Sequence, residues 1–128
     1  MNSFKKGELE IMELLWGQER ALTHAEISDR LKETTGRNTV YLHLNSLLAK
    51  GAIQIGPSVR RGRTYGRTFL AAVSKAEYLA SQVVDVAQGD SKALQTMFAY
   101  FLGAGDVTNE TLDELEKRIQ EKRKELNS

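Results

Sequence analysis

The 128-residue sequence contains no cysteine and only two histidines, His24 and His43. Without cysteine, a disulfide framework, a thiolate metal site and a cysteine nucleophile are all excluded. The histidines lack a His-x-x-x-His spacing and an acidic partner at metal-ligand spacing, so we expect no metal site and a half-buried packing role for His43. A glycine-rich phosphate loop and a nucleophile motif are also missing, and we expect neither an enzyme nor a cofactor.

Long hydrophobic runs are missing as well. The longest uninterrupted apolar runs span only a few residues, whereas a membrane-spanning helix needs about 20. The first residues lack the apolar core of a signal peptide. With 41% hydrophobic and 27% charged residues, the composition is typical of a globular protein. We therefore expect a cytoplasmic protein without membrane insertion.

Acidic residues are absent from one long stretch of the chain. The whole chain has 18 basic and 17 acidic residues, yet residues 36–74 carry six basic side chains and no Asp or Glu. Residues 1–74 hold 11 basic against 7 acidic residues, a net charge of +4, and residues 75–128 hold 7 against 10, a net charge of −3. This asymmetry indicates that the first part binds a polyanion and that the second part has a different role.

The first fifty residues carry three amphipathic helical patterns. The first helix is expected over residues 7–16. The second begins with a capping box at residues 23–26 and is expected to end at Gly36. The third is expected to start near Asn38 as its N-cap and to end at Gly51. The last two helices are thus joined by a tight turn.

After the third helix, the period of the hydrophobic pattern changes. A short alternating segment at residues 52–55, a turn-rich tip at residues 56–62 and a segment at residues 63–70 that favours strands predict a β-hairpin with a basic tip. Two helices joined by a short turn and followed by a basic hairpin are the arrangement of a winged helix-turn-helix domain. We therefore predict a mainly α fold with a small β-hairpin wing, and assign residues 1–73 to a winged-helix DNA-binding domain.

The third helix carries the side chains that we expect to read DNA. Its apolar face would be buried, and its opposite face is mostly polar. Asn can bond adenine through two hydrogen bonds, Thr and Ser can contact phosphate or base, and Leu can meet a thymine methyl group. Arginines of the hairpin would neutralise phosphates. The predicted DNA-binding residues are Arg37, Asn38, Thr39, Tyr41, Leu42, Asn45, Ser46, Arg60, Arg61 and Arg63.

Residues 74–128 predict a helical dimerisation region. A second capping box at residues 74–77 begins one helix, residues 89–91 break it, and two more helices are expected before Gly103 and after Thr108. The apolar stripes of these helices are too large to be buried within a single charged helix, which favours association with a second subunit. Alternatively, these helices could fold back on the winged domain as ordinary core. A two-fold dimer would space two recognition helices roughly 34 Å apart on a palindrome. The predicted dimerisation residues are Leu94, Met97, Phe98, Phe101, Leu102, Leu112, Leu115 and Ile119.

Five segments of the chain resemble, in order, the motifs of a known family. They are residues 7–16, Arg37 to Val40, Leu44 to Gly51, Gly62 to Tyr65, and Ser74 to Tyr78. This ordered set is similar to the penicillinase repressor family, the BlaI/MecI/CopY type, over nearly the whole chain. The resemblance implies a dimeric transcriptional repressor whose N-terminal winged helix binds a palindromic operator and whose C-terminal helices hold two subunits together.

The resemblance also has consequences for induction. In penicillin-responsive members, a membrane sensor–protease system ends repression by cleaving an Asn–Phe bond in the C-terminal segment. The corresponding junction here is Tyr100–Phe101, so the resemblance implies a sensor protease acting near it, and the absence of the Asn weighs against such cleavage. The copper-responsive branch uses a C-terminal cysteine cluster that this chain lacks, which excludes metal sensing by that route.

Two other functions stay open beside the predicted homodimeric repressor. A winged helix could serve as a protein-interaction module, with the basic hairpin meeting an acidic partner. The chain could also be a small-molecule-responsive regulator with a ligand between its C-terminal helices, although the apolar stripe there has no polar cluster to orient one. Within the predicted DNA-binding surface, Leu42 has a second interpretation, which is that it covers the hairpin.

Overall fold

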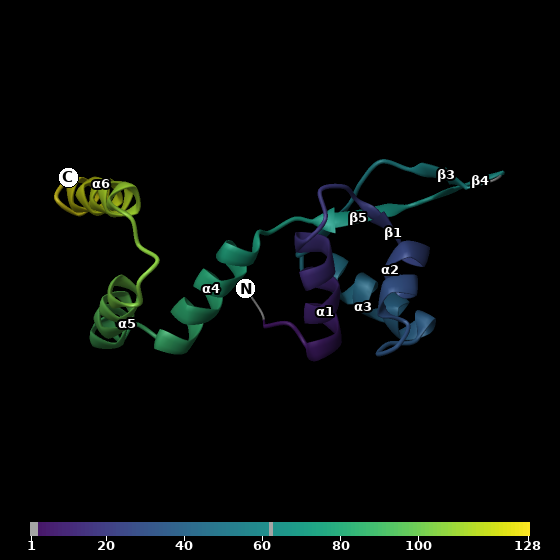
Figure 1. Cartoon of the computed structure of the whole chain (residues 1–128), viewed down its shortest axis with the longest axis horizontal. Coiled ribbons are helices and arrows are strands. Elements are labelled where there is room, and N and C mark those ends of the chain that lie inside the picture. The colour runs from purple at the N-terminus through teal and green to yellow at the C-terminus, as the bar shows by residue number, and fades with distance from the viewer. Residues whose placement is uncertain (1–2, 62) are drawn as a thin grey trace. The chain divides into compact units, whose positions relative to one another are not determined.

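The structure is a computed structural model that describes residues 3–61 and 63–128. Contacts divide the chain into two compact units, Met1–Val86 and Ala87–Ser128. Within these residues, the first unit combines three helices, α1 (Lys6–Trp16), α2 (His24–Leu31) and α3 (Arg37–Ala49), with five short strands (Figure 1). The second unit contains helices α5 (Ser91–Gly103) and α6 (Asn109–Leu126), and helix α4 (Lys75–Ala87) precedes them.

Helices α1 (Lys6–Trp16) and α2 (His24–Leu31) begin close to where the sequence predicts them. The predicted capping box of α2 is confirmed. The backbone N–H of Glu26 donates to the Thr23 hydroxyl at 3.1 Å, and the backbone N–H of Thr23 donates to the Glu26 carboxylate at 3.1 Å. Two of the unpaired amides at the start of the helix are satisfied in this way.

The turn between α2 and α3 (Arg37–Ala49) differs from the prediction. Helix α2 ends at Leu31 and not at Gly36. The Leu31 carbonyl accepts from the backbone N–H groups of Thr34 at 3.0 Å and of Thr35 at 2.8 Å, which closes a turn after the helix. Gly36 is instead the N-cap of α3, so Asn38 lies within the first turn of that helix and not at its cap. The two helices are joined by a short turn, as predicted.

Two small antiparallel sheets form the wing and its base. In the first sheet, β5 (Thr68–Ala71) lies between β1 (Leu22–Thr23) and β2 (Ile53–Ile55). In the second, β3 (Val59–Arg61) pairs with β4 (Thr64–Gly66) and extends the hairpin outward (Figure 1). The predicted hairpin is confirmed, but β3 forms within the stretch predicted as a turn-rich tip. Strand β1 was not predicted, because two residues are too short to show an alternating pattern.

The first unit has its own hydrophobic core, to which α1, α2, α3 and the three-stranded sheet all contribute. Burying one large apolar side chain contributes roughly 1.5–3 kcal/mol. These contributions hold α3 against the other elements by its apolar face. The buried core residues are Ile11, Met12, Leu15, Leu22, Ile27, Val40, Leu44, Leu47, Ala52, Ile53 and Phe69.

Helix α4 (Lys75–Ala87) begins with the second predicted capping box, which is also confirmed: the Glu77 N–H donates to the Ser74 hydroxyl and the Ser74 N–H to the Glu77 carboxylate, each at 3.0 Å. The ring of Tyr78 is buried and stacks on Phe4 with centroids 4.2 Å apart. Contacts therefore place nearly all of α4 with the first unit, whereas the sequence boundary lies between residues 73 and 74. The division into a DNA-binding and a dimerisation part stays a prediction.

Helices α5 (Ser91–Gly103) and α6 (Asn109–Leu126) begin at side-chain caps. The Asp90 carboxylate accepts from the backbone N–H of Ala93 at 3.0 Å, and the Thr108 hydroxyl from that of Thr111 at 3.1 Å. Neither helix has a buried residue. The mainly α fold with a β-hairpin wing is confirmed, and none of the described helices is long and apolar enough to span a membrane.

Candidate nucleic-acid interface

Helix α3 presents an exposed, mostly polar surface on the side away from the core. The Leu42 side chain is 65% exposed, so it does not cover the hairpin. Helix α3 is therefore buried along one face and open along the other, as a helix that enters a DNA groove must be. The predicted DNA-binding residues exposed on this helix are Arg37, Asn38, Thr39, Tyr41, Leu42 and Asn45.

Ser46 does not belong to this exposed surface, and the face predicted for it is wrong. Its hydroxyl donates to Oε2 of Glu8 on α1 at 2.6 Å. Lys50, one helical turn later on the same face of α3, places its Nζ 2.7 Å from Oε1 of the same carboxylate. The backbone N–H of Lys5 donates to Oε1 at 2.8 Å. Ser46 is thus engaged in holding α3 against α1.

Glu8 is fully buried and stays ionised. Burial alone would raise the pKa of Glu8, but hydrogen bonds from Lys50, Ser46 and the Lys5 backbone, together with the charge of Lys50, outweigh it and lower the pKa to about 2. The carboxylate therefore stays charged at neutral pH. The sequence does not distinguish Glu8 from the other acidic residues of α1, because its side-chain partners Ser46 and Lys50 lie far along the chain.

A second pair of contacts fixes the beginning of α3. The Nε2 atom of His24 lies 3.2 Å from the backbone carbonyl of Arg37, and because a carbonyl only accepts, Nε2 carries the hydrogen in this bond. The His24 ring lies 5.8 Å from the ring of Tyr41. The start of α2 is therefore joined to the start of α3, beside the side chains expected to meet DNA.

A hollow of about 250 Å³ lies between the start of α2, helix α3 and the base of the wing. Its charged side chains are Arg37 and Arg67, and no carboxylate is among the described residues that line it. The Arg67 guanidinium lies 5.7 Å from the centre of the Phe69 ring. Arg67 was not among the predicted DNA-binding residues, although its place in the stretch free of acidic residues could have indicated it.

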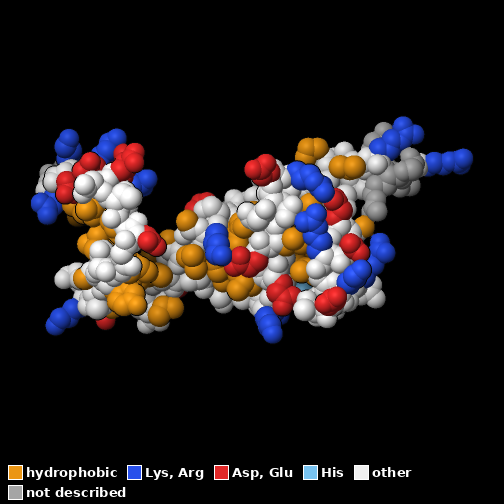
Figure 2. Space-filling view, viewed as in Figure 1, with side chains coloured by type: hydrophobic (Ala, Val, Ile, Leu, Met, Phe, Trp, Pro, Cys, Tyr) orange, Lys and Arg blue, Asp and Glu red, His pale blue; other side chains and the backbone are white. Residues whose placement is uncertain are grey.

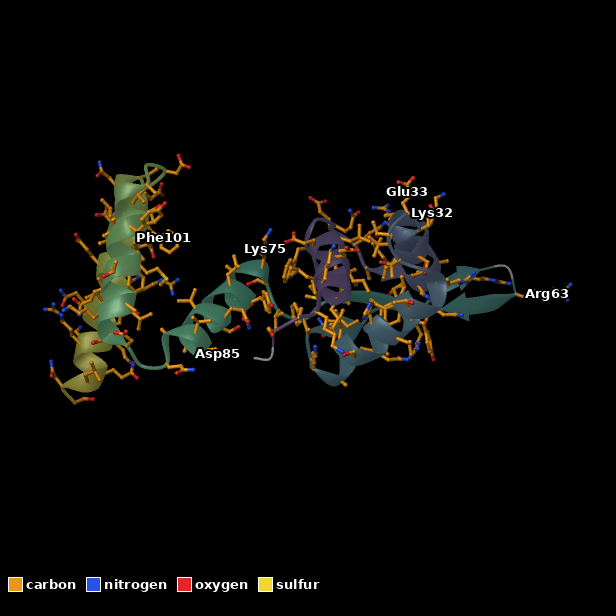
Figure 3. The ribbon with its side chains drawn as sticks, turned by 90° about the horizontal axis from the view of Figure 1, so that it is seen from below. Lys32, Glu33, Arg63, Lys75, Asp85 and Phe101 are labelled. Atoms are coloured by element: carbon orange, nitrogen blue, oxygen red, sulfur yellow. The ribbon has the colours of Figure 1, made fainter. Side chains whose placement is uncertain are left out.

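The wing carries the remaining predicted arginines. Figure 3 shows Arg63 at the outer end of the wing, pointing away from the rest of the unit, and Figure 2 shows basic side chains gathered there. The side chain of Arg60 is exposed. The side chain of Arg61 lies outside the described residues. The structure thus brings the base of a basic wing beside the exposed face of α3.

The predicted dimerisation residues lie along α5 and α6 without being buried. Leu94, Met97 and Leu112 are half-buried and the other five are exposed, with Phe98 at 57% and Phe101 at 56%. Apolar side chains gather over α5 (Figure 2), and Phe101 is labelled on that helix in Figure 3. They are therefore not buried within the second unit itself. The Tyr100–Phe101 junction lies inside α5, and cleavage there stays a prediction.

A helix-turn-helix followed by a basic antiparallel wing defines the class of winged-helix, DNA-binding transcription regulators. Residues 5–121 match the sequence model of the family described as "Penicillinase repressor". The chain belongs to the penicillinase repressor family, which confirms the assignment made from the ordered motifs.

Several solved structures are similar to this chain. The ferric uptake regulator Fur of Helicobacter pylori is 22% identical over 55% of this chain and 47% of its own, with a TM-score of 0.44. A variant of ZitR from Lactococcus lactis is 18% identical over 97% of this chain and 76% of its own, with a TM-score of 0.46. MarR of Staphylococcus aureus, in complex with salicylate and kanamycin, is 18% identical over 98% and 74%, with a TM-score of 0.41. Comparison with curated protein sequences found no match.

Proposed function

We propose that the chain is a homodimeric repressor that binds a palindromic operator, with α3 in the major groove and the wing on the backbone or in the minor groove. One observation is the main support for this proposal. The exposed face of α3 and the wing both lie within residues 36–74, which contain no Asp or Glu. A surface without carboxylates beside a polar helix suits a ligand with a negatively charged backbone and hydrogen-bonding base edges.

Two kinds of contact to DNA follow from the side chains on this surface. Asn38, Thr39 and Asn45 are exposed on α3 and offer the amides and hydroxyl that read base edges. Arg37 and Arg67 border the hollow beside them, which suits a phosphate next to the groove. Arg60, Arg61 and Arg63 of the wing would neutralise further phosphates. Ser46 takes no part, because its hydroxyl is bonded to Glu8.

Exposure of apolar side chains in the second unit supports the homodimer. No residue of α5 or α6 is buried, yet both helices carry large apolar side chains. Burying each of them would contribute roughly 1.5–3 kcal/mol. A second copy of the chain is the partner that also explains recognition of a palindrome, since a two-fold dimer presents two identical recognition helices.

The test selects duplexes from a random DNA pool with the protein itself and then measures their affinity by fluorescence anisotropy. We expect a palindromic consensus with half-sites one turn of DNA apart, about 10 base pairs, and an affinity that falls steeply as salt rises. Sedimentation equilibrium is expected to give a dimer. Enrichment of no sequence, with equal binding to random DNA, would overturn the repressor and favour a module that binds an acidic protein partner.

A further inference from the structure

Helix α6 carries a narrow apolar seam that the second unit leaves largely exposed. Leu112, Leu115, Ile119 and Leu126 occupy heptad positions a, d, a and a, and Lys122 occupies the remaining d position. Ile119 is 52% exposed and Leu126 is 71% exposed. A seam of this spacing is the surface along which one helix packs on another.

Charged side chains flank this seam in an ordered way. Glu116 and Arg123 occupy the e positions on one side, and Arg118 and Glu125 occupy the g positions on the other. Each flank thus has one acidic and one basic residue, in opposite order along the helix. The Lys122 ammonium lies 3.5 Å from the Glu125 carboxylate on the same helix, so its charge is turned toward that flank.

These charges disfavour a parallel pair of α6 helices. In a parallel pair, a g residue of one helix faces the e residue five positions further along the other. Arg118 would then face Arg123 of the second copy, and this contact of like charges would occur twice. Lys122 would also face Lys122 across the seam. Like charges at such positions oppose pairing.

An antiparallel pair reverses the sign of these contacts. Reversing one helix brings e beside e and g beside g. With Leu115 opposite Leu126 of the second copy, each acidic flank residue lies opposite the basic residue of the same flank. All four flank contacts of the dimer are then between opposite charges, and Lys122 packs its aliphatic part beside Ile119.

The charges also select one antiparallel register. Shifting one helix by a heptad places Leu115 opposite Ile119 and keeps the seam apolar. However, Glu116 would then face Glu116 and Arg118 would face Arg118 of the second copy. Apolar packing alone would allow both registers, whereas the flanking charges favour only the first.

We propose that α6 pairs antiparallel with α6 of a second copy, with Leu115 opposite Leu126 and Glu116 opposite Arg123. This rests on the homodimer proposed above and specifies how its subunits meet. Charge complementarity between two copies of this helix identifies a second copy of the chain as its partner. Pairing of α6 with α5 of the second copy is the competing arrangement.

Disulfide crosslinking tests the direction and the register of the α6 pair. Because the chain has no native cysteine, only the introduced cysteines can form a disulfide. Leu115→Cys and Leu126→Cys are prepared separately, oxidised alone, and oxidised as an equal mixture. In the proposed pair, position 115 lies beside position 126, but two 115 positions lie about 16 Å apart at 1.5 Å per residue. A disulfide requires Cα atoms within roughly 7 Å. We expect a crosslinked dimer in the mixture and none from either variant alone.

Sedimentation of the wild type and both variants separates the ways in which this can fail. Crosslinking of each variant with itself would show a parallel pair and overturn the proposal. A dimer by sedimentation without any crosslink would show that α6 pairs in another register or meets another element, and this also overturns the proposal while leaving the homodimer intact. A monomeric wild type would overturn the homodimer itself.

Charge reversal provides a second readout that does not alter the seam. Arg123→Glu is expected to raise the dimer dissociation constant about tenfold, because two attractive contacts become repulsive. Adding Glu116→Arg to it should restore wild-type affinity. The matched control is Lys124→Glu, which makes the same charge change on the outer face and should leave affinity within about twofold. In a parallel pair, Arg123→Glu would instead tighten the dimer by meeting Arg118, and that result would overturn the proposal.

Discussion

The ammonium of Lys50 lies 2.7 Å from the carboxylate of Glu8, which is fully buried between α1 and α3. This ion pair joins the C-terminal end of the helix proposed to read DNA to the first helix of the same unit. Lys50 also lies 5.9 Å from the ring centre of Phe4, which stacks on Tyr78 of α4. One cluster thus connects α1, α3 and the helix that leads to the second unit.

Replacing Lys50 should lower the free energy of unfolding more than neutralising Glu8, the residue that it pairs with. Lys50→Met leaves the buried Glu8 carboxylate without its counter-ion, and we expect the free energy of unfolding to fall by about 3 kcal/mol. Glu8→Gln keeps a polar group for Ser46 and Lys5 to contact and is expected to cost less. Urea denaturation followed by circular dichroism measures both. Equal stability of Lys50→Met and the wild type would contradict this account.

The Glu8 carboxylate also makes the stability of the fold depend on pH. Because its hydrogen bonds and the charge of Lys50 outweigh burial, the pKa of Glu8 falls from the ordinary 4.5 to about 2 in the folded chain. The folded state therefore binds fewer protons than the unfolded state between these values, and stability falls as the pH falls. We expect the contribution of Glu8 to be complete above pH 4.5 and lost below pH 2. Urea midpoints measured across this range should decline less in Glu8→Gln than in the wild type, and parallel curves would contradict the assignment.

Gly7 permits the close approach of α1 to α3. A Cβ atom added at Gly7 would lie 2.3 Å from Nε2 of His43, which is half-buried as predicted. We expect Gly7→Ala to displace the His43 ring and to destabilise the unit by about 1 kcal/mol, because the atoms that the new Cβ would meet are the end of a side chain that can move. Adding His43→Ala should recover part of this loss. Gly17→Ala is the control, because its Cβ would meet only ordinary contacts, the nearest at 3.5 Å.

Local features of the fold could be predicted because their partners lie close together in the sequence. Both capping boxes join residues three apart, so Thr23 with Glu26 and Ser74 with Glu77 are visible in the sequence itself. Helical periodicity predicted the exposed face of α3 for every residue placed there except Ser46, whose hydroxyl is bonded to Glu8 on α1. Helix ends were less predictable, since a glycine such as Gly36 can either end a helix or begin one.

Contacts between distant segments could not be predicted in this way. Glu8 and Lys50 are 42 residues apart, and their pairing depends on how α1 crosses α3. The hollow beside Arg67 forms only once the base of the wing lies next to the start of α2. Hydrophobic and charge patterns report which face is buried, but they do not report which polar side chains meet across a core.

Asn45 and Ser46 are neighbours in the sequence with different expected roles. Asn45 is exposed on the proposed DNA-reading face, whereas the Ser46 hydroxyl is bonded to Glu8. We expect Asn45→Ala to lose about 1–3 kcal/mol of discrimination at one base position. Ser46→Ala should keep the sequence preference and lose about 1 kcal/mol of stability. Anisotropy with single-base operator variants and urea denaturation measure the two effects, and a changed base preference in Ser46→Ala would contradict this division.

Arg67 is expected to contact phosphate and not a base, since it borders the hollow together with Arg37 and lies off α3. Replacing it with Ala should weaken binding to all sequences about equally. The slope of log K against log salt should also become shallower by about 0.9, because one fewer counterion is released. Lys92→Ala is the matched control, because it removes an exposed positive charge from α5, outside the stretch free of acidic residues. Its salt dependence should equal that of the wild type. An unchanged slope in Arg67→Ala, or a loss confined to one operator sequence, would place Arg67 outside the phosphate contacts.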